Sequence, residues 1–212
     1  MVVTLLDYGS GNILNVVRAL KHVGINISVA KTSEEILKAS SLVVPGVGAF
    51  SDCMSRLENQ GLDEAIKEFA STGKPLIGIC LGMQILFESS NEFGYTQGLG
   101  LISGEVRPIV SEKLAPTVRI PHIGWNSLVP PEGHKDWQCS QFSGLETKSL
   151  SVYFVHSFAA FPTDQSDRLA DCIYEGNRIC AAVSHENILG FQFHPERSGK
   201  TGLQILRKFV KM

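Results

Sequence analysis

Hydrophobic and polar positions follow two alternating periods along the first eighty residues. The segment Asn12–His22 has the apolar spacing of a helix, and a second helix is expected to begin at Thr32, because Thr32 and Glu35 have the form of a capping box. Three short apolar runs are typical of buried strands: Val2–Leu6, Ile27–Ala30 and Leu42–Val44. This strand-helix rhythm predicts an α/β fold with a parallel sheet.

After about residue 100 the pattern changes to shorter strands and turns, which favours antiparallel additions to the sheet. The expected strands are Val106–Val110, Ser151–His156, Ala170–Tyr174, Arg178–Ser184 and Ile188–Phe193. A closing helix is expected over Thr201–Lys211, because Leu203, Leu206 and Val210 fall on one face. No loop is long enough to be a domain linker, so we expect one domain over residues 1–212.

One cysteine lies between two glycines where a strand is expected to meet a helix. Pro75–Ile79 is apolar and typical of a central strand, and Met83–Glu88 is rich in helix formers. Gly78 and Gly82 flank Cys80 at two residues on either side, as in the sharp nucleophile elbow of hydrolases. A helix N-terminus there would favour the thiolate. The alternative is a small buried core cysteine with glycines placed for close packing.

A second segment near the end of the chain supplies a candidate base. His194 ends an alternating strand, and Glu196 follows two positions later, where the two side chains can lie on the same side. His194 could take the Cys80 proton, while Glu196 accepts a hydrogen bond from the other ring nitrogen. The pair of segments therefore predicts a Cys-His-Glu triad.

The Gly78–Gln84 run together with the distal His-Pro-Glu resembles the class I (triad) glutamine amidotransferase family. The resemblance spans essentially the whole chain through four further segments: Asp7–Asn12, Pro45–Gly48, Pro121–Asn126 and His194–Gly199. It implies an open, mostly parallel flavodoxin-like sheet flanked by helices, with antiparallel strands added in the C-terminal half. It also implies that the chain hydrolyses L-glutamine.

The glycines of Pro45–Gly48 leave backbone N–H groups free to approach a ligand. A tetrahedral intermediate on Cys80 needs hydrogen-bond donors for its oxyanion, and the Leu81 N–H plus one from Gly46, Val47 or Gly48 could supply them. The resemblance implies that role. Without it, the segment would be an ordinary tight turn.

The resemblance also places residues that bind the substrate glutamine: Gln84, Glu92, His156 and Ser157. Glu92 would pair with the α-amino group. Taken singly, each residue has a simpler interpretation: Gln84 and Glu92 would lie on a solvated helix face, and His156 would be a hydrogen-bonded histidine at a strand end. Phe158 departs from the tyrosine expected in many relatives, which removes a hydroxyl but keeps the aromatic surface.

Once these motifs are placed, no segment is left for an ammonia-accepting domain, so we expect a partner to supply it. The four flanking segments are most similar to the branch of the family that serves histidine biosynthesis, which implies a heterodimer with a (β/α)₈-barrel cyclase subunit. Asn12, Trp125 and Arg197 lie in the segments that resemble the partner-facing surface, although Trp125 could equally be core. We further hypothesise that glutaminase activity is latent until the cyclase binds its nucleotide.

Composition narrows the class of protein. The chain has 212 residues, 43% of them hydrophobic, which is enough for one well-buried α/β domain. Its net charge is −2, so it has no basic surface charge of the kind that binds nucleic acid. The N-terminal residues lack the basic region of a signal peptide, and no run of about 18 apolar residues could cross a membrane. We therefore expect a cytoplasmic protein that does not contact the membrane. The chain has five cysteines, Cys53, Cys80, Cys139, Cys172 and Cys180. Their odd number and the lack of Cys-x-x-Cys spacing argue against a disulfide framework and a zinc site. The sequence indicates no cofactor.

Two alternatives stay open at this point. The chain could be a triad glutaminase of another synthase, such as one for pyridoxal phosphate or anthranilate, although the Pro121–Asn126 and His194–Gly199 segments argue against it. It could also be a non-catalytic binding module that kept the fold. The intact set of Cys80, His194 and Glu196 argues against that second alternative.

Overall fold

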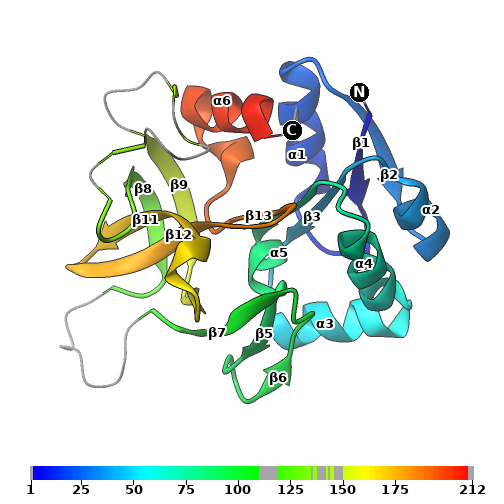
Figure 1. The fold of residues 1–212 in the computed structure, drawn as a ribbon, viewed down its shortest axis with the longest axis horizontal. Helices are drawn as coiled ribbons and strands as arrows, with labels where there is room; N and C mark the ends of the chain where they lie inside the picture. The colour runs from blue at the N-terminus through cyan, green and yellow to red at the C-terminus, as the bar shows by residue number, and fades with distance from the viewer. Residues whose placement is uncertain are drawn as a thin grey trace.

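The computed structural model describes residues 2–109, 119–134, 136–137, 142, 144–145 and 150–209. Among these residues, nine strands form one sheet in the order β2-β1-β3-β4-β13-β12-β11-β8-β9 (Figure 1). Their bounds are β1 Val2–Leu6, β2 Asn26–Ala30, β3 Leu42–Gly46, β4 Leu76–Cys80, β8 His122–Val129, β9 Ser151–His156, β11 Arg168–Tyr174, β12 Asn177–His185 and β13 Ile188–Phe191. Four strands form a second sheet: β10 Phe158–Pro162, β7 Ile102–Pro108, β5 Phe87–Ser90 and β6 Thr96–Gln97.

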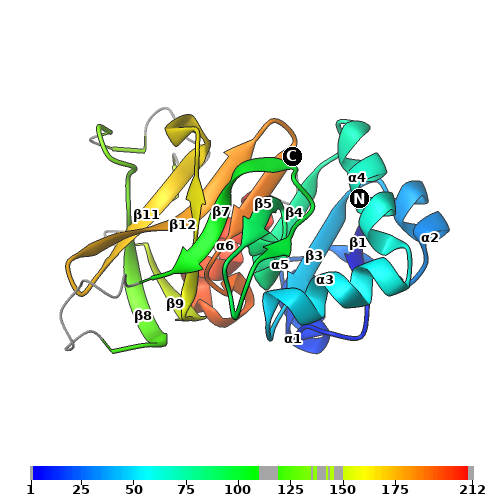
Figure 2. The ribbon, with the colours of Figure 1, turned by 90° about the horizontal axis from the view of Figure 1, so that it is seen from below.

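The large sheet is parallel in one half and antiparallel in the other. Strands β2, β1, β3, β4 and β13 run parallel, whereas β13, β12, β11, β8 and β9 pair in antiparallel fashion. Figures 1 and 2 both place the antiparallel strands at the end of the molecule away from β2 and α2 (Ser33–Lys38). The predicted fold is confirmed, with one correction: β13 is antiparallel only to β12, because the hairpin from β12 returns it alongside β4.

Helices cover both faces of the parallel half. On one face, α1 (Ile13–His22) and α6 (Gly199–Phe209) pack on one core cluster, and on the other α3 (Phe50–Asn59) and α4 (Leu62–Ser71) pack on a second. Strand β1 contributes to both clusters, with Val3 and Leu5 in the first and Leu6 in the second, because successive side chains of a strand point to opposite faces.

Several local predictions are confirmed and others are not. The capping box of Thr32 and Glu35 is present, with Glu35 N–H donating to Thr32 Oγ1 over 3.3 Å. The expected strand Val106–Val110 corresponds to the end of β7, but the periodicity did not reveal α3, α4, β8 or the other strands of the second sheet. The last expected residues of two elements, Val110 in one strand and 210–211 in the closing helix, lie outside the described residues.

The helix expected over Met83–Glu88 is wrong. The helix α5 covers only Leu81–Gln84, and Phe87 already begins strand β5. Pairing of β5 with β6 and β7 overrides the helix preference of these residues. The short helix matters for the site, because it begins directly after Cys80.

Candidate active site

Cys80 ends strand β4 at the carboxyl edge of the parallel sheet, where ligands of open α/β folds bind. Its φ of 56° and ψ of −113° are strained for a residue with a side chain. A Cβ at Gly82 would collide with the Val44 carbonyl, and one at Gly78 would collide with the backbone of Gly82. The predicted elbow is therefore present, and both glycines are required by close backbone approach.

The predicted role of a helix dipole is not supported by this geometry. A helix of four residues, Leu81–Gln84, aligns too few peptide units for a substantial macrodipole. Stabilisation of a Cys80 thiolate must therefore come from individual side chains and N–H groups around it.

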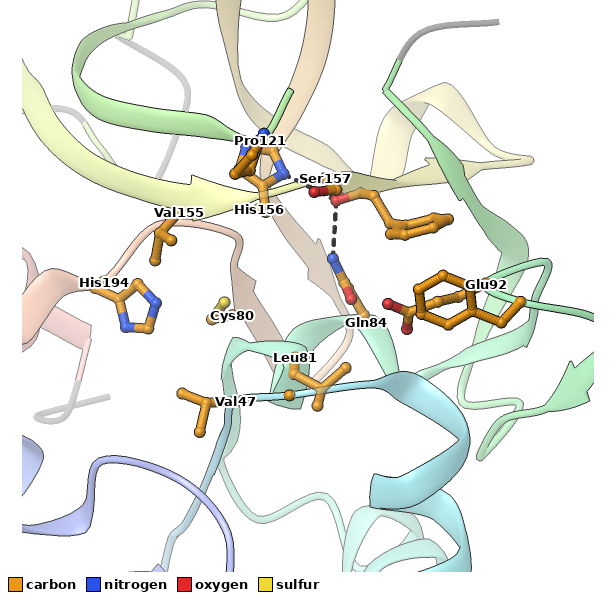
Figure 3. A pocket seen from close by; sticks show the side chains of 13 residues that line it. Val47, Cys80, Leu81, Gln84, Glu92, Pro121, Val155, His156, Ser157 and His194 are labelled. Atoms are coloured by element: carbon orange, nitrogen blue, oxygen red, sulfur yellow. Dashed lines mark hydrogen bonds between the residues drawn. The ribbon is translucent and has the colours of Figure 1, made fainter. Parts of the chain in front are cut away.

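His194 and Glu196 lie on the chain that follows β13, and both are buried. His194 Nδ1 lies 2.8 Å from Glu196 Oε1, with side-chain exposures of 5% and 1%. His194 Nε2 has no hydrogen-bond partner among the described residues. In Figure 3 the Cys80 side chain lies between those of His194 and Gln84. The far nitrogen of His194 is thus the one left for proton exchange with Cys80.

Opposing effects set the pKa of His194. Burial alone lowers the pKa, but the Cys80 and Glu196 side chains outweigh burial and raise it to about 10. The protonated ring is therefore favoured when its neighbours are anionic. This arrangement suits a thiolate-imidazolium pair, the reactive state of Cys-His nucleophiles.

A pocket of about 430 Å³ opens above Cys80 and His194. Every residue predicted from sequence to bind glutamine lines this pocket, together with three of the predicted oxyanion residues: Gln84, Glu92, His156, Ser157, Val47, Gly48 and Leu81. Gly46 lies beneath it as the last residue of β3. The structure thus brings together residues that are spread from position 46 to position 196 of the sequence.

The end of β3 and the residues directly after it, Pro45–Gly48, lie against the elbow and are held by two hydroxyl groups. Tyr8 Oη donates to the Pro45 carbonyl over 2.9 Å, and Ser10 Oγ donates to the Val47 carbonyl over 2.9 Å. A Cβ at Gly46 would lie 2.7 Å from Gly82 N, and Gly48 has a φ of +102°. The backbone of this segment is therefore specified, and the sequence pattern did not reveal either hydroxyl contact.

Gln84 is buried, not part of a solvated helix face. Its Nε2 donates to the Phe158 carbonyl and to Gln192 Oε1, both over 2.9 Å (Figure 3 shows the first). Gln192 is completely buried and was missed by the sequence reasoning, although it lies only two residues before His194. The alternation of the strand that leads to His194 was the available signal.

Glu92 lies at the other end of the pocket. Its Oε2 accepts a hydrogen bond of 2.6 Å from the Phe50 N–H, at the start of α3. Burial raises the pKa of this carboxyl group, and the Phe50 N–H opposes that rise. A ligand ammonium group would compensate for the burial, which fits the predicted role.

His156 reaches the pocket, but its ring nitrogens are used within the protein. Nδ1 lies 2.8 Å from the Phe158 carbonyl, and Nε2 lies 3.0 Å from His122 Nδ1. Burial lowers the pKa of His156 to about 3, so the ring is neutral. The arrangement is that of a hydrogen-bonded strand-end histidine that shapes the turn, and Ser157 beside it keeps its side chain at the pocket.

Comparison with known proteins identifies the family. The family model for glutamine amidotransferase class-I matches residues 4–212. The chain belongs to the class I glutamine amidotransferases. A solved structure titled glutamine amidotransferase covers the whole of both chains with a TM-score of 0.74 at 19% identity, which supports the fold.

Within the class I amidotransferases, the chain is similar to two named proteins over nearly its whole length. It is 47% identical to the imidazole glycerol phosphate synthase subunit HisH 1 of Legionella pneumophila, over 99% of each chain. It is 40% identical to the chloroplastic imidazole glycerol phosphate synthase hisHF of Arabidopsis thaliana, over 99% of this chain and 34% of that longer protein.

The three residues expected at a partner surface have defined positions in this amidotransferase. Asn12 caps α1, where its side chain accepts from the Asn15 N–H over 3.4 Å. Trp125 is 58% exposed, so it is not core. Trp125 packs edge-on against Tyr153, and the Arg197 guanidinium lies 4.3 Å from the centre of the same ring.

Among the described residues, no group of three or more His, Cys, Asp and Glu side chains is arranged to hold a metal. No helix in that part of the amidotransferase is long and apolar enough to cross a membrane. Four of the five cysteines are free and buried, and the fifth, Cys139, lies outside the described residues.

Proposed function

We propose that this chain is the glutaminase subunit of imidazole glycerol phosphate synthase, with Cys80, His194 and Glu196 as its catalytic triad. It hydrolyses L-glutamine to glutamate and ammonia. The observation that carries the proposal is the buried His194–Glu196 pair beside the strained Cys80, in a chain 47% identical over 99% of its length to a HisH subunit.

The chemistry begins with attack of the Cys80 thiolate on the side-chain amide carbon of glutamine. A C–S bond forms, and the carbonyl oxygen becomes an oxyanion in a tetrahedral intermediate. His194 donates its proton to the amide nitrogen, the C–N bond breaks, and ammonia leaves. Loss of the thiolate charge removes one cause of the raised pKa of His194, which makes proton transfer to the leaving group easier.

The second half of the reaction hydrolyses the thioester. Neutral His194 takes a proton from water, the resulting hydroxide attacks the acyl carbon, and the C–S bond breaks to release glutamate. Glu196 accepts the Nδ1 hydrogen bond throughout, so Nε2 is the nitrogen that exchanges protons. The N–H of Leu81 and one N–H of the Gly46–Gly48 segment stabilise the oxyanion.

Gln84, Glu92 and Ser157 bind the amino-acid end of the substrate. Both described hydrogen bonds of the Gln84 amide use Nε2, so Oε1 remains to accept from the substrate ammonium group. Glu92 supplies the opposite charge. His156 holds the strand end that carries Ser157, and we assign it no direct contact through its ring.

Ammonia passes to a (β/α)₈-barrel cyclase subunit that makes imidazole glycerol phosphate and aminoimidazole carboxamide ribonucleotide in histidine biosynthesis. Delivery must be direct, because ammonia is mostly protonated in neutral water and then is no nucleophile. We assign Asn12, Trp125 and Arg197 to the contact surface. The longer Arabidopsis relative, of which this chain matches 34%, supports a close association with a further unit.

The test is glutamate release from glutamine by the chain alone, with a cyclase subunit, and with that subunit plus its nucleotide. We expect turnover only in the last mixture, and none when Cys80→Ala replaces the wild-type chain. Strong turnover by the chain alone would contradict the hypothesis that glutaminase activity is latent until the cyclase binds its nucleotide. No turnover in any mixture would contradict the proposed function.

A further inference from the structure

Gln192 lies completely buried next to the nucleophile. Its Nε2 is 3.9 Å from Cys80 Sγ, and its own backbone N–H donates to the Ala181 carbonyl over 2.9 Å. The backbone contact fixes the start of the side chain on the strand that leads to His194. A polar amide with no exposure requires hydrogen-bond partners at both of its ends.

The polarity of this amide follows from a backbone carbonyl. The Phe158 carbonyl can only accept, so the Gln84 atom beside it is nitrogen. That same nitrogen also donates to Gln192, so the Gln192 atom beside it is oxygen. The nitrogen of Gln192 is therefore the atom that faces the sulfur of Cys80. The chain of contacts thus presents an N–H donor to the nucleophile.

From this geometry we propose that Gln192 is a positioning residue for the glutaminase reaction, which donates a hydrogen bond to the Cys80 thiolate. The inference rests on the proposed function of the triad. A donor held in a buried site favours the charged form of its acceptor without adding a charge of its own. With only a four-residue helix behind Cys80, such side-chain donors take the place of a helix dipole.

The titratable groups around Cys80 differ from Gln192 in kind. His194 is the proton partner, the buried Tyr8 hydroxyl and His156 lie on neighbouring elements, and Glu92 lies at the other end of the pocket. The Tyr8 hydroxyl already donates to the Pro45 carbonyl, and the His156 nitrogens lie against the Phe158 carbonyl and His122, so Gln192 is the neutral donor that faces the sulfur. Removal of Gln192 should therefore change how the nucleophile responds to pH.

The experiment measures the alkylation rate of Cys80 by iodoacetamide from pH 5 to 9, in the full chain without partner or glutamine. Mass spectrometry of the peptide that contains Cys80 separates it from the other cysteines. The test variant is Gln192→Met, which has a similar shape and no donor. Val155→Ala is the control, because Val155 lines the same pocket but its side chain has no hydrogen-bond donor, and the Gln84–Gln192 contact stays in place.

We expect Gln192→Met to move the alkylation midpoint upward by about one pH unit, so that the rate at pH values well below the midpoint falls about tenfold, with the high-pH plateau kept. The control should change that rate less than about threefold, since it removes no hydrogen bond to the sulfur. An unchanged midpoint in folded Gln192→Met would overturn the proposal. An equal shift in both variants would overturn it too, because the effect would then come from loosened packing.

A measurement on the wild-type chain keeps the proposal testable if Gln192→Met does not fold. The side-chain NH₂ resonances of Gln192 should shift with pH over the same range as the alkylation rate, and should lose that shift in Cys80→Ala. Resonances that do not respond to pH would refute the hydrogen bond. Neither readout depends on glutamine turnover, so an inactive chain could still confirm the donor, and an active glutaminase could lack it.

Discussion

At the scale of single residues, the site contains buried histidines of two kinds. His194 has the Glu196 carboxylate as its partner, and with Cys80 this raises its pKa to about 10. His156 and His122 contact mainly each other, a backbone carbonyl and aromatic rings, none of which carries a charge. Burial lowers their pKa values to about 3 for His156 and about 4 for His122. Burial alone therefore does not decide the protonation of these histidines; the charge of the nearest partner does.

The orienting carboxylate gives the first prediction. Glu196→Gln keeps the shape of the side chain but removes the negative charge and can stabilise the wrong tautomer of His194. We expect kcat for glutamine to fall by about 10²–10⁴ in the complex with the cyclase subunit, with KM nearly unchanged. Steady-state glutamate release measures both constants. A kcat within threefold of wild type would show that Glu196 is not the orienter.

The neutral histidine pair predicts a pH dependence of stability. In the unfolded chain both rings take up a proton near pH 6.5, whereas in the folded chain they stay neutral down to about 4 and about 3. Between those limits the unfolded state binds more protons, so the unfolding free energy falls with falling pH. The maximum slope is about 1.4 kcal/mol per pH unit for each histidine.

Urea unfolding at pH 7.5, 6.0 and 5.0 measures this slope. His122→Phe should reduce it by the share of one histidine, because the phenyl ring keeps the stacking on Phe154 and Tyr174 but cannot be protonated. Leu14→Ala, at an exposed position on α1, removes no titratable group and should leave the slope as it is. The same slope in wild type and His122→Phe would contradict the assignment.

At the scale of elements, the ends of β3, β4 and β13 meet at one edge of the sheet, and the proposed oxyanion segment, Cys80 and His194 lie at or just after them. Gly48, after β3, has a φ of +102°, and no atom lies within 4 Å of the position that a Cβ would take, so a side chain there meets backbone strain and no clash. We expect Gly48→Ala to turn the local N–H groups away from the oxyanion and to lower kcat about 10²-fold.

Gly24→Ala is the matched control for that substitution. Gly24 has a φ of +81°, also with nothing within 4 Å, but it follows α1 and is remote from the pocket. Both variants should lose about 1 kcal/mol of unfolding free energy, and only Gly48→Ala should lose activity. Urea unfolding and glutamate release test the pair. Equal activity of the two would place the oxyanion donors elsewhere.

The elements also show what a sequence pattern can specify. The strand β1, the capping box at Thr32 and the elbow at Cys80 follow from local steric and hydrogen-bond rules, and all three are confirmed. The strand β5 could not be predicted, because its pairing with β7 depends on residues 15 or more positions away. Gln192 was missed for a similar reason: its partners Gln84 and Cys80 lie more than 100 positions away.

At the scale of the whole molecule, exposed aromatic surface lies beside the site. Trp125 on β8 and Arg197 in the turn after His194 both pack on Tyr153 of β9, and the Tyr153 carbonyl accepts from the His194 N–H over 2.9 Å. A partner seated on this surface would therefore contact the strand that supports the catalytic histidine. If the proposed partner surface and triad are right, one backbone hydrogen bond, from the His194 N–H to the Tyr153 carbonyl, joins them and offers a short route for coupling between the subunits.

Trp125 gives the prediction that tests this surface. A large ring that is 58% exposed costs little to remove from the isolated chain, but a central tryptophan often dominates an interface. We expect Trp125→Ala to leave the unfolding free energy within about 0.5 kcal/mol of wild type and to weaken binding of the cyclase subunit by about 2 kcal/mol, which is about thirtyfold in Kd. Val29→Ala, at an exposed position on the edge strand β2, is the control and should bind normally. Urea unfolding measures the first quantity and titration calorimetry the second, and unchanged binding by Trp125→Ala would move the partner surface away from β8.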